Sequence, residues 1–446
     1  MPETTINRTI GALGILTALV FGCELVRPAA AGELPPDSFA SLAPRPIKEK
    51  PSRDYTALPA GGWLFYPSLL AGAVYDDNIF QTPTNKTARL GGQVMPSLVA
   101  IRDDGIHKLT LYGTADARLY SGSSDYDSLI GRAGFNHQYE AMRDLVFRFQ
   151  GDYIRQTDVF NSAATLNNAI GTTNPFAISP RARPFPYNQF VGSASVVKMF
   201  NRSFVSLRGS VSHITYDSSN GVANNPPNTI TPPDGTIYSV TGRTGYWVSP
   251  LFNVYVEPTF NWLQYAGVAG DSTSYRVVSG IATSQIGLYR GEIFAGYQEQ
   301  RTTQAISSTG LTIGGTVIGG RLTYEPTRFL TLRASLDETL GISQTNDPTA
   351  PIGTPTRQTM AVLDAAYTMR QDLIVMVRAG YVNNAYHPTF AGTRSDDGWL
   401  AGLKWMYNFN RNFGIAFDYQ HTELTSNVVN SGYARNVVTL STTYRY

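Results

Sequence analysis

The chain has 446 residues, with 35 Lys and Arg against 33 Asp and Glu, so its formal net charge is only +2. This balance, without basic runs, argues against a nucleic-acid partner. No stretch after residue 26 reaches the ~18 apolar residues that a membrane-spanning helix needs, which excludes a helical membrane protein. Charged residues form only 15% of the sequence, whereas Tyr, Phe and Gly are abundant.

Residues 1–31 have the pattern of a secretory signal peptide, with an apolar run followed by three alanines. We expect cleavage before Gly32 and export across the inner membrane. The single cysteine, Cys23, lies inside this segment, so a chain cut there can form no disulfide. The sequence VFGC at 20–23 loosely resembles a lipoprotein box, which leaves lipidation of Cys23 as an alternative.

Residues 32–61 contain six prolines and little periodicity, the composition of an extended segment. We expect a proline-rich periplasmic arm here. A plain spacer and a docking peptide for a periplasmic partner are both compatible with this composition.

From residue 62 to 446 the chain consists of segments in which apolar and polar residues alternate, as in membrane strands with one lipid face and one aqueous face. Residues 108–119 are an example: Leu109, Leu111 and Leu119 fall on one face, and Asp116 and Arg118 on the other. A soluble sandwich also alternates, but its turns would be short at both ends.

The connections between these segments alternate between short and long. Short turns are predicted at 102–107, 140–143, 200–202, 249–251, 287–290, 325–328, 370–372 and 408–412. They imply an all-β, closed antiparallel transmembrane barrel of about 18 strands, with short periplasmic turns and both chain ends on the turn side. Sixteen is the fallback, because 240–249 and 277–285 are weakly patterned. The long connections, notably 157–188 and 216–237, are predicted to be extracellular loops.

Charged residues on the inward positions predict a water-filled lumen, because a charge facing lipid would cost ~2 to 4 kcal/mol. The basic ones are Lys108, Arg118, Arg148, Arg208, Arg333, Arg378, Arg435 and Arg445, and the acidic ones are Asp116, Asp152, Glu257, Asp337 and Asp418. The excess of eight basic over five acidic residues would favour anionic or polar solutes modestly. Alternatively, opposite charges such as Arg148 and Asp152 pair and stiffen the wall.

The stretch AGAVYDDNIF at 71–80 breaks its apolar pattern with Asp76, Asp77 and Asn78. A Ca²⁺ loop would need more oxygen ligands and a distal Glu. We therefore favour strand-end or turn chemistry for this triplet. The sequence predicts no metal site and no cofactor.

Four stretches carry a family resemblance: AGAVYDDNIFQT (71–82), VMPSLVAI (94–101), HKLTLYGTADARLY (107–120) and SGSSDYDS (121–128). Together they resemble the family of putative outer-membrane β-barrel porins, also labelled outer membrane β-barrel protein. The resemblance implies a porin-sized barrel in the outer membrane of a Gram-negative bacterium. Some members of the family serve as conduits for secreted polysaccharide. The last residue, Tyr446, departs from the phenylalanine commonest at barrel C-termini but keeps an aromatic ring.

By analogy with porins, the loop 157–188 could fold inward and narrow the pore with Arg181 and Arg183; a solvated external loop is equally compatible. The expected partners are outer-membrane lipid and lipopolysaccharide, the barrel-assembly machinery and a periplasmic polysaccharide-export protein. The predicted girdle residues are Trp63, Trp247, Trp262, Trp399 and Trp405.

The prediction is a porin-like, water-filled conduit for polar solutes, with export of a secreted polysaccharide as the most specific cargo. A general diffusion porin and a non-conducting structural or adhesive barrel are the alternatives, and bulky inward residues would favour the last. No local catalytic motif is present and the five histidines are scattered, so we do not expect an enzyme.

Overall fold

The computed structural model describes residues 57–122, 127–158, 185–217, 234–265, 271–286, 288–302, 311–342, 355–386, 394–429 and 431–446. The predicted signal peptide, Cys23 and most of the predicted arm lie outside these ranges. Within them no helix is long and apolar enough to cross a membrane.

The described residues form nineteen strands, of which β1 is very short. The strands are β1 (Leu58–Ala60), β2 (Trp63–Asp76), β3 (Arg89–Asp103), β4 (His107–Tyr120), β5 (Ser128–Met142), β6 (Leu145–Asp158), β7 (Phe185–Phe200), β8 (Ser203–Tyr216), β9 (Gly235–Trp247), β10 (Phe252–Tyr265), β11 (Ser272–Ile286), β12 (Tyr289–Thr302), β13 (Leu311–Thr327), β14 (Leu330–Ile342), β15 (Pro355–Arg370), β16 (Leu373–Tyr386), β17 (Ser395–Asn408), β18 (Phe413–Ser426) and β19 (Tyr433–Arg445).

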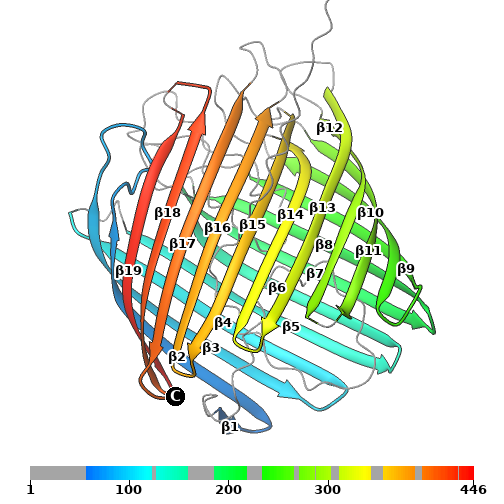
Figure 1. The fold of residues 1–446 in the computed structure, drawn as a ribbon, viewed down its shortest axis with the longest axis horizontal. Coiled ribbons are helices and arrows are strands. Elements are labelled where there is room, and N and C mark those ends of the chain that lie inside the picture. Colours follow the sequence, from blue (N-terminus) through cyan, green and yellow to red (C-terminus); the bar gives the residue numbers. More distant parts are fainter. Residues whose placement is uncertain are drawn as a thin grey trace, which may run out of the picture.

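Strands β2 to β19 form a closed antiparallel barrel of eighteen strands. Each strand pairs with the next along the chain, and β19 pairs with β2 to close the circle. In Figure 1 the blue β2 and the red β19 therefore meet although they stand at opposite ends of the sequence. The fold class is confirmed, and closure leaves no free sheet edge at the two ends of the strand order.

All eight predicted short turns join consecutive strands, including β9 to β10 and β11 to β12, where the sequence pattern is weak. The count of eighteen is thus correct and the fallback of sixteen is wrong. Strand β1 falls inside the segment predicted as an arm and pairs with the beginning of β2 through Leu58↔Phe65 and Ala60↔Trp63.

Alternating side chains give the barrel an apolar outer face. On β4, Leu111 and Leu119 are 41% and 63% exposed, because nothing in the protein covers a lipid-facing side chain. Asp116 and Arg118 have the opposite parity and lie on the inner face. The same parity rule assigns the face of every strand residue discussed below.

One of the predicted girdle tryptophans is misplaced. Trp262 and Trp399 are about half exposed on the outer face, as expected of interfacial anchors. Trp247 has the parity of the inner face, opposite to the exposed Tyr246, and packs against an inward cluster of Phe204, Tyr255 and Ala282. The sequence assignment failed because Trp247 is the last residue of β9, where alternation gives little warning of the side-chain direction.

Candidate functional site: the inner wall

The inner face of strands β9 to β14 carries a network of three arginines and three carboxylates. Glu292 on β12 lies at its centre, with Oε2 2.8 Å from Arg243 Nη2 and Oε1 2.8 Å from Arg321 Nη1. Arg243 also lies 3.5 Å from Glu257 Oε2 on β10. The guanidinium of Arg243 stacks over the Tyr255 ring, 3.5 Å from its centroid. Its positive charge is thus stabilised by Glu292, Glu257 and this ring.

The network continues to β14 through Asp337. Its carboxylate lies 3.3 Å from Arg276 Nη2 and 3.7 Å from Arg321 Nη2. We call Arg243, Glu257, Arg276, Glu292, Arg321 and Asp337 the charge network. Its three positive and three negative charges balance, so this part of the wall carries no net formal charge.

A second group surrounds Asp152, whose side chain is almost fully buried on the inner face of β6. Arg132 Nε donates to its Oδ1 at 2.7 Å, and Gln150 Nε2 donates to its Oδ2 at 2.8 Å. The Tyr112 hydroxyl donates a further hydrogen bond. These three donors satisfy the carboxylate in its buried position.

Other predicted charges also have partners on the wall. Asp116 accepts from Gln93 Nε2 at 2.8 Å and from its strand neighbour Arg118 at 3.0 Å. Arg378 pairs with Asp364 at 2.7 Å. These pairs join neighbouring or identical strands, so they stiffen the wall without crossing the lumen.

The remaining predicted residues with described positions are also inward. Asp418 lies 3.5 Å from Lys404 Nζ, Arg208 donates to Ser193 Oγ at 3.2 Å, and Lys108 pairs with Asp103 at 2.9 Å near a short turn. Arg148 and Arg333 have the inner-face parity and make interactions of their own.

The last inward arginine, Arg445, donates from Nη1 to Asn408 Oδ1 at 3.2 Å. The predicted constriction residues Arg181 and Arg183 lie outside the described residues. Their part in a constriction therefore stays a prediction.

Apolar side chains also occupy the inner face. Val382, Leu400, Leu424 and Tyr433, on β16 to β19, belong to a cluster whose members are at most 5% exposed. A second inward cluster, the one that Trp247 joins, lies on β8 to β11. The sequence pattern does not reveal these patches, because the inward positions are recognised by their charged residues alone.

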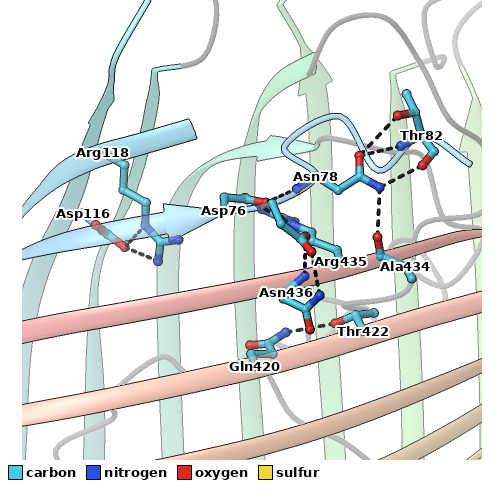
Figure 2. A network of polar contacts seen from close by, with 11 residues as sticks. Asp76, Asn78, Thr82, Asp116, Arg118, Gln420, Thr422, Ala434, Arg435 and Asn436 are labelled. Carbon is cyan, nitrogen blue, oxygen red and sulfur yellow. Dashed lines mark hydrogen bonds and ion pairs between the residues drawn. The ribbon is translucent and has the colours of Figure 1, made fainter. Parts of the chain in front are cut away.

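The triplet Asp76, Asp77 and Asn78 joins the first barrel strand to the last. Figure 2 shows Asp76 and Asn78 beside Arg435 and Ala434 of the last strand. Asp76, fully buried, accepts from Arg435 Nε at 3.0 Å and from Arg435 Nη2 at 2.5 Å. Asp77 accepts from the backbone and side-chain nitrogens of Asn436, both at 2.6 Å.

Asn78 completes the connection. Its Nδ2 donates to Ala434 O at 2.9 Å and to Thr82 O at 2.8 Å, and its Oδ1 accepts from Thr82 N at 3.0 Å. We call Asp76, Asp77 and Asn78, with their β19 partners, the closing clasp. Strand-end chemistry was the favoured interpretation of the triplet, and its long-range role could not be predicted from one sequence.

Several inward charges escaped the sequence analysis. They are Asp76, Arg132, Arg243, Arg276, Glu292, Arg321, Asp364 and Lys404. Arg132 lies on β5, whose outer positions include Gly131 and His137 and so blur the alternation. Arg243 and Arg276 lie on the two weakly patterned strands, β9 and β11. Counting alternate residues from the short turns beside these two strands would have placed both arginines on the inner face.

The comparisons with known proteins agree with this architecture. The family model described as Putative beta-barrel porin 2 matches residues 51–446. The chain belongs to this family. It is therefore a porin-like β-barrel of the Gram-negative outer membrane. No curated protein matches the chain.

Solved structures are similar to the chain at low sequence identity and with low TM-scores. OpdK from Pseudomonas aeruginosa is 10% identical with a TM-score of 0.41, over 86% of this chain and 99% of that one. OccAB3 from Acinetobacter baumannii is 11% identical with a TM-score of 0.43, over 86% and 99%. The ferric citrate transporter FecA is 11% identical with a TM-score of 0.42; 81% of this chain covers 60% of FecA.

Proposed function

We propose that the barrel conducts polar, overall uncharged solutes through its lumen, and that its cargo is a secreted polysaccharide. The observation that carries this proposal is the self-neutralised inner wall. Each carboxylate of the charge network lies within 4.0 Å of an arginine, as do Asp116, Asp152 and Asp364, and Asp418 lies within the same distance of Lys404. Such a wall exerts little net field on a passing ion.

Amide and hydroxyl groups between the charged pairs favour a hydroxylated solute. Gln189 donates to Ser212 at 2.8 Å on β7 and β8, and Gln358 donates to Asn384 at 2.7 Å on β15 and β16. Both pairs are buried in the wall, so sugar hydroxyls can replace these hydrogen bonds at similar energy only where local motion exposes them. Eighteen strands are enough to enclose an aqueous channel.

Single-channel conductance in planar bilayers tests the proposal. The refolded barrel should give discrete steps, and neutral glycan fragments added to one side should block them. A charged oligomer of the same length serves as the matched probe and should block less. Steps indifferent to every glycan would refute the polysaccharide cargo and leave a general diffusion porin.

The inward apolar clusters favour a second candidate, a structural barrel that does not conduct. The members of both clusters are buried, so they present little surface to a passing solute. A properly folded barrel that shows no conductance under any voltage or salt would support this candidate and contradict the conduit.

A further inference from the structure

Besides the closing clasp, the barrel wall has an irregular region between β13 and β14, where the backbone ladder is short. The ladder of these two strands begins at the short turn and ends at Gly319↔Asp337. Beyond this pair, on the side away from the short turn, β13 continues to Leu311 and is paired only with β12. On the same side β14 continues to Ile342 and is paired only with β15. Within the described strands, residues 311–318 and 338–342 thus have no ladder to each other. We call this part the lapped seam.

The two edges overlap at the seam. Gly315 faces inward on β13, whereas Arg357 on β15 has the outward parity of the exposed Leu363 and Tyr367. A Cβ placed on Gly315 would nevertheless collide with the Arg357 guanidinium. The outer face of β15 therefore lies against the inner face of β13, which glycine makes possible because it has no side chain there.

Burial agrees with this overlap. Leu340 on β14 has the outward parity of Leu332 and Leu336, yet it is only 2% exposed. Lipid-facing residues of β13 and β12 contrast with it: Ile318 is 50% and Ile293 67% exposed. Leu340 is thus covered by protein on the face where its neighbours along the barrel meet lipid.

Few hydrogen bonds hold the lapped seam together. The side-chain amide of Gln298, on β12, replaces the missing ladder: Nε2 donates to Leu340 O at 2.8 Å and Oε1 accepts from Leu340 N at 3.1 Å. Arg357 Nη1 donates to Glu338 Oε1 at 2.7 Å and reaches Thr316 O at 3.4 Å. The ladder between β13 and β14 has seven residue pairs, whereas every other ladder between neighbouring described strands of the barrel has at least nine, so the seam is the place where the wall opens most easily.

The surroundings of the seam specify what could cross it. On its outer side Ile318 faces lipid at the lower end, and the higher outward positions carry Glu299 on β12 and the ion pair of Arg357 with Glu338. Asp337, at its lower end on the inner side, belongs to the charge network, where it meets Arg276 and Arg321. The seam lies on the side away from the short turn and so in the outer-leaflet half of the barrel. It connects an exterior that is apolar at its lower end and polar towards the long loops with a polar, charge-balanced interior.

We propose that the lapped seam is a lateral portal through which an amphiphile passes between the lumen and the outer leaflet. The ligand has an alkyl chain and a polar head without net charge, because the charge network has none. The portal requires neither a polysaccharide cargo nor an open pore. It adds a lateral route through the wall to the proposed axial route along the lumen.

Photolabelling in liposomes tests the portal. The probe is an alkyl glycoside with a diazirine in its chain, and mass spectrometry locates the adducts. We expect adducts on Val317, an inward residue of the seam that is fully buried when the seam is closed. Ile318 faces lipid and should be labelled in every variant, which checks delivery of the probe. No adduct on Val317 in the unmodified barrel would overturn the proposal.

A cross-link across the seam supplies the decisive comparison. The Arg357 side chain already reaches Gly315, so a short bis-maleimide can join Gly315→Cys to Arg357→Cys. Joining should lower labelling of Val317 at least fivefold relative to the same double variant without reagent. Leu322→Cys with Ala334→Cys, opposite each other in the intact ladder, is the matched control and should change nothing when joined. Equal labelling of Val317 with the seam open or joined would refute a portal.

An alkyl sulfate with the same photoreactive chain tests the head group. We expect it to label Val317 several-fold less than the glycoside does, while labelling Ile318 equally. Equal labelling of Val317 by both probes would contradict the selection of an uncharged head.

Discussion

The barrel has two shortened seams, and they are finished in different ways. Between β2 and β19 the ladder covers nine residue pairs, from Val437↔Asp76 to Arg445↔Ser68, and between β13 and β14 it covers seven. At the first seam the closing clasp continues the connection with a buried ion pair and several hydrogen bonds beyond the last pair. At the second, only two described side chains, those of Gln298 and Arg357, bridge the gap, to Leu340 and to Thr316.

The two seams differ because only β13 and β14 are joined by a short turn, whereas β2 and β19 must be held together by specific contacts. The β2–β19 seam joins segments more than 350 residues apart in the sequence, and no turn holds them together. Loop-closure entropy opposes this pairing more than any hairpin pairing, so the clasp supplies specific contacts. Strands β13 and β14 are held by their short turn, and the wall above that turn can remain loosely joined.

The largest expected effect comes from breaking the clasp with Asp76→Ala. Arg435 would then be left largely buried without its carboxylate, which destabilises by about 3 to 5 kcal/mol. Urea unfolding in detergent or bilayers measures the change.

Asp116→Ala is the control for the clasp, since its partner Arg118 lies on the same strand. It should be milder and should leave barrel closure intact. The double variant Asp76→Ala, Arg435→Met should regain part of the lost stability. Equal destabilisation by Asp76→Ala and Asp116→Ala would remove the special role of the closing seam.

A smaller and local effect is expected from Gln298→Leu at the lapped seam. The buried backbone N–H and C=O of Leu340 lose their partner, a loss of about 1 to 3 kcal/mol. Amide hydrogen exchange should accelerate in β14 near Leu340 while β19 stays protected. Gln300→Leu, which removes only a side-chain contact with Ser272 on the same face, is the control. Acceleration spread evenly over both seams would contradict a local role for Gln298.

Glu292→Gln tests the neutrality of the wall through ion selectivity, at a cost in stability because the buried Arg243 then keeps only the Glu257 charge. The amide can still accept hydrogen bonds, but Arg243 and Arg321 then lack their shared negative charge. The lumen gains one positive charge, and anion selectivity should rise by roughly two- to fivefold. Reversal potentials in a salt gradient measure the ratio, and Glu299→Gln on the outer face of the same strand should leave it unchanged.

The smallest effect is expected at the short turn between β5 and β6. Lys198 donates to Asp144 there at 2.5 Å, and this hydrogen bond lowers the carboxyl pKa below its usual 3.8. Its stabilisation is present above pH 3.8 and is lost as the pH falls through the lowered pKa. Because the pair is exposed, Asp144→Asn should leave the unfolding midpoint at neutral pH unchanged within error. A clear shift of the midpoint at neutral pH would show that this exposed ion pair stabilises the barrel more than its exposure predicts.

The sequence was sufficient for the strand count, the turns and the two faces, because the period of two is local and strong in segments such as 108–119. It was insufficient for the contacts between strands. The pairing of Asp76 with Arg435 spans most of the chain, and the end of the ladder at Gly319↔Asp337 depends on how β14 and β15 pack behind β13. Weak alternation accounts for the inward charges missed on β5, β9 and β11, whereas those on β2, β12, β13, β15 and β17 were missed although these strands were recognised.

Neutrality of the inner wall can be measured as the reversal potential of the unmodified barrel across a potassium chloride gradient. If the charges of the wall neutralise each other, we expect open channels with a reversal potential near zero, because potassium and chloride have similar mobilities. A strongly anion-selective or cation-selective potential would show that unpaired charge controls the lumen and would contradict the account.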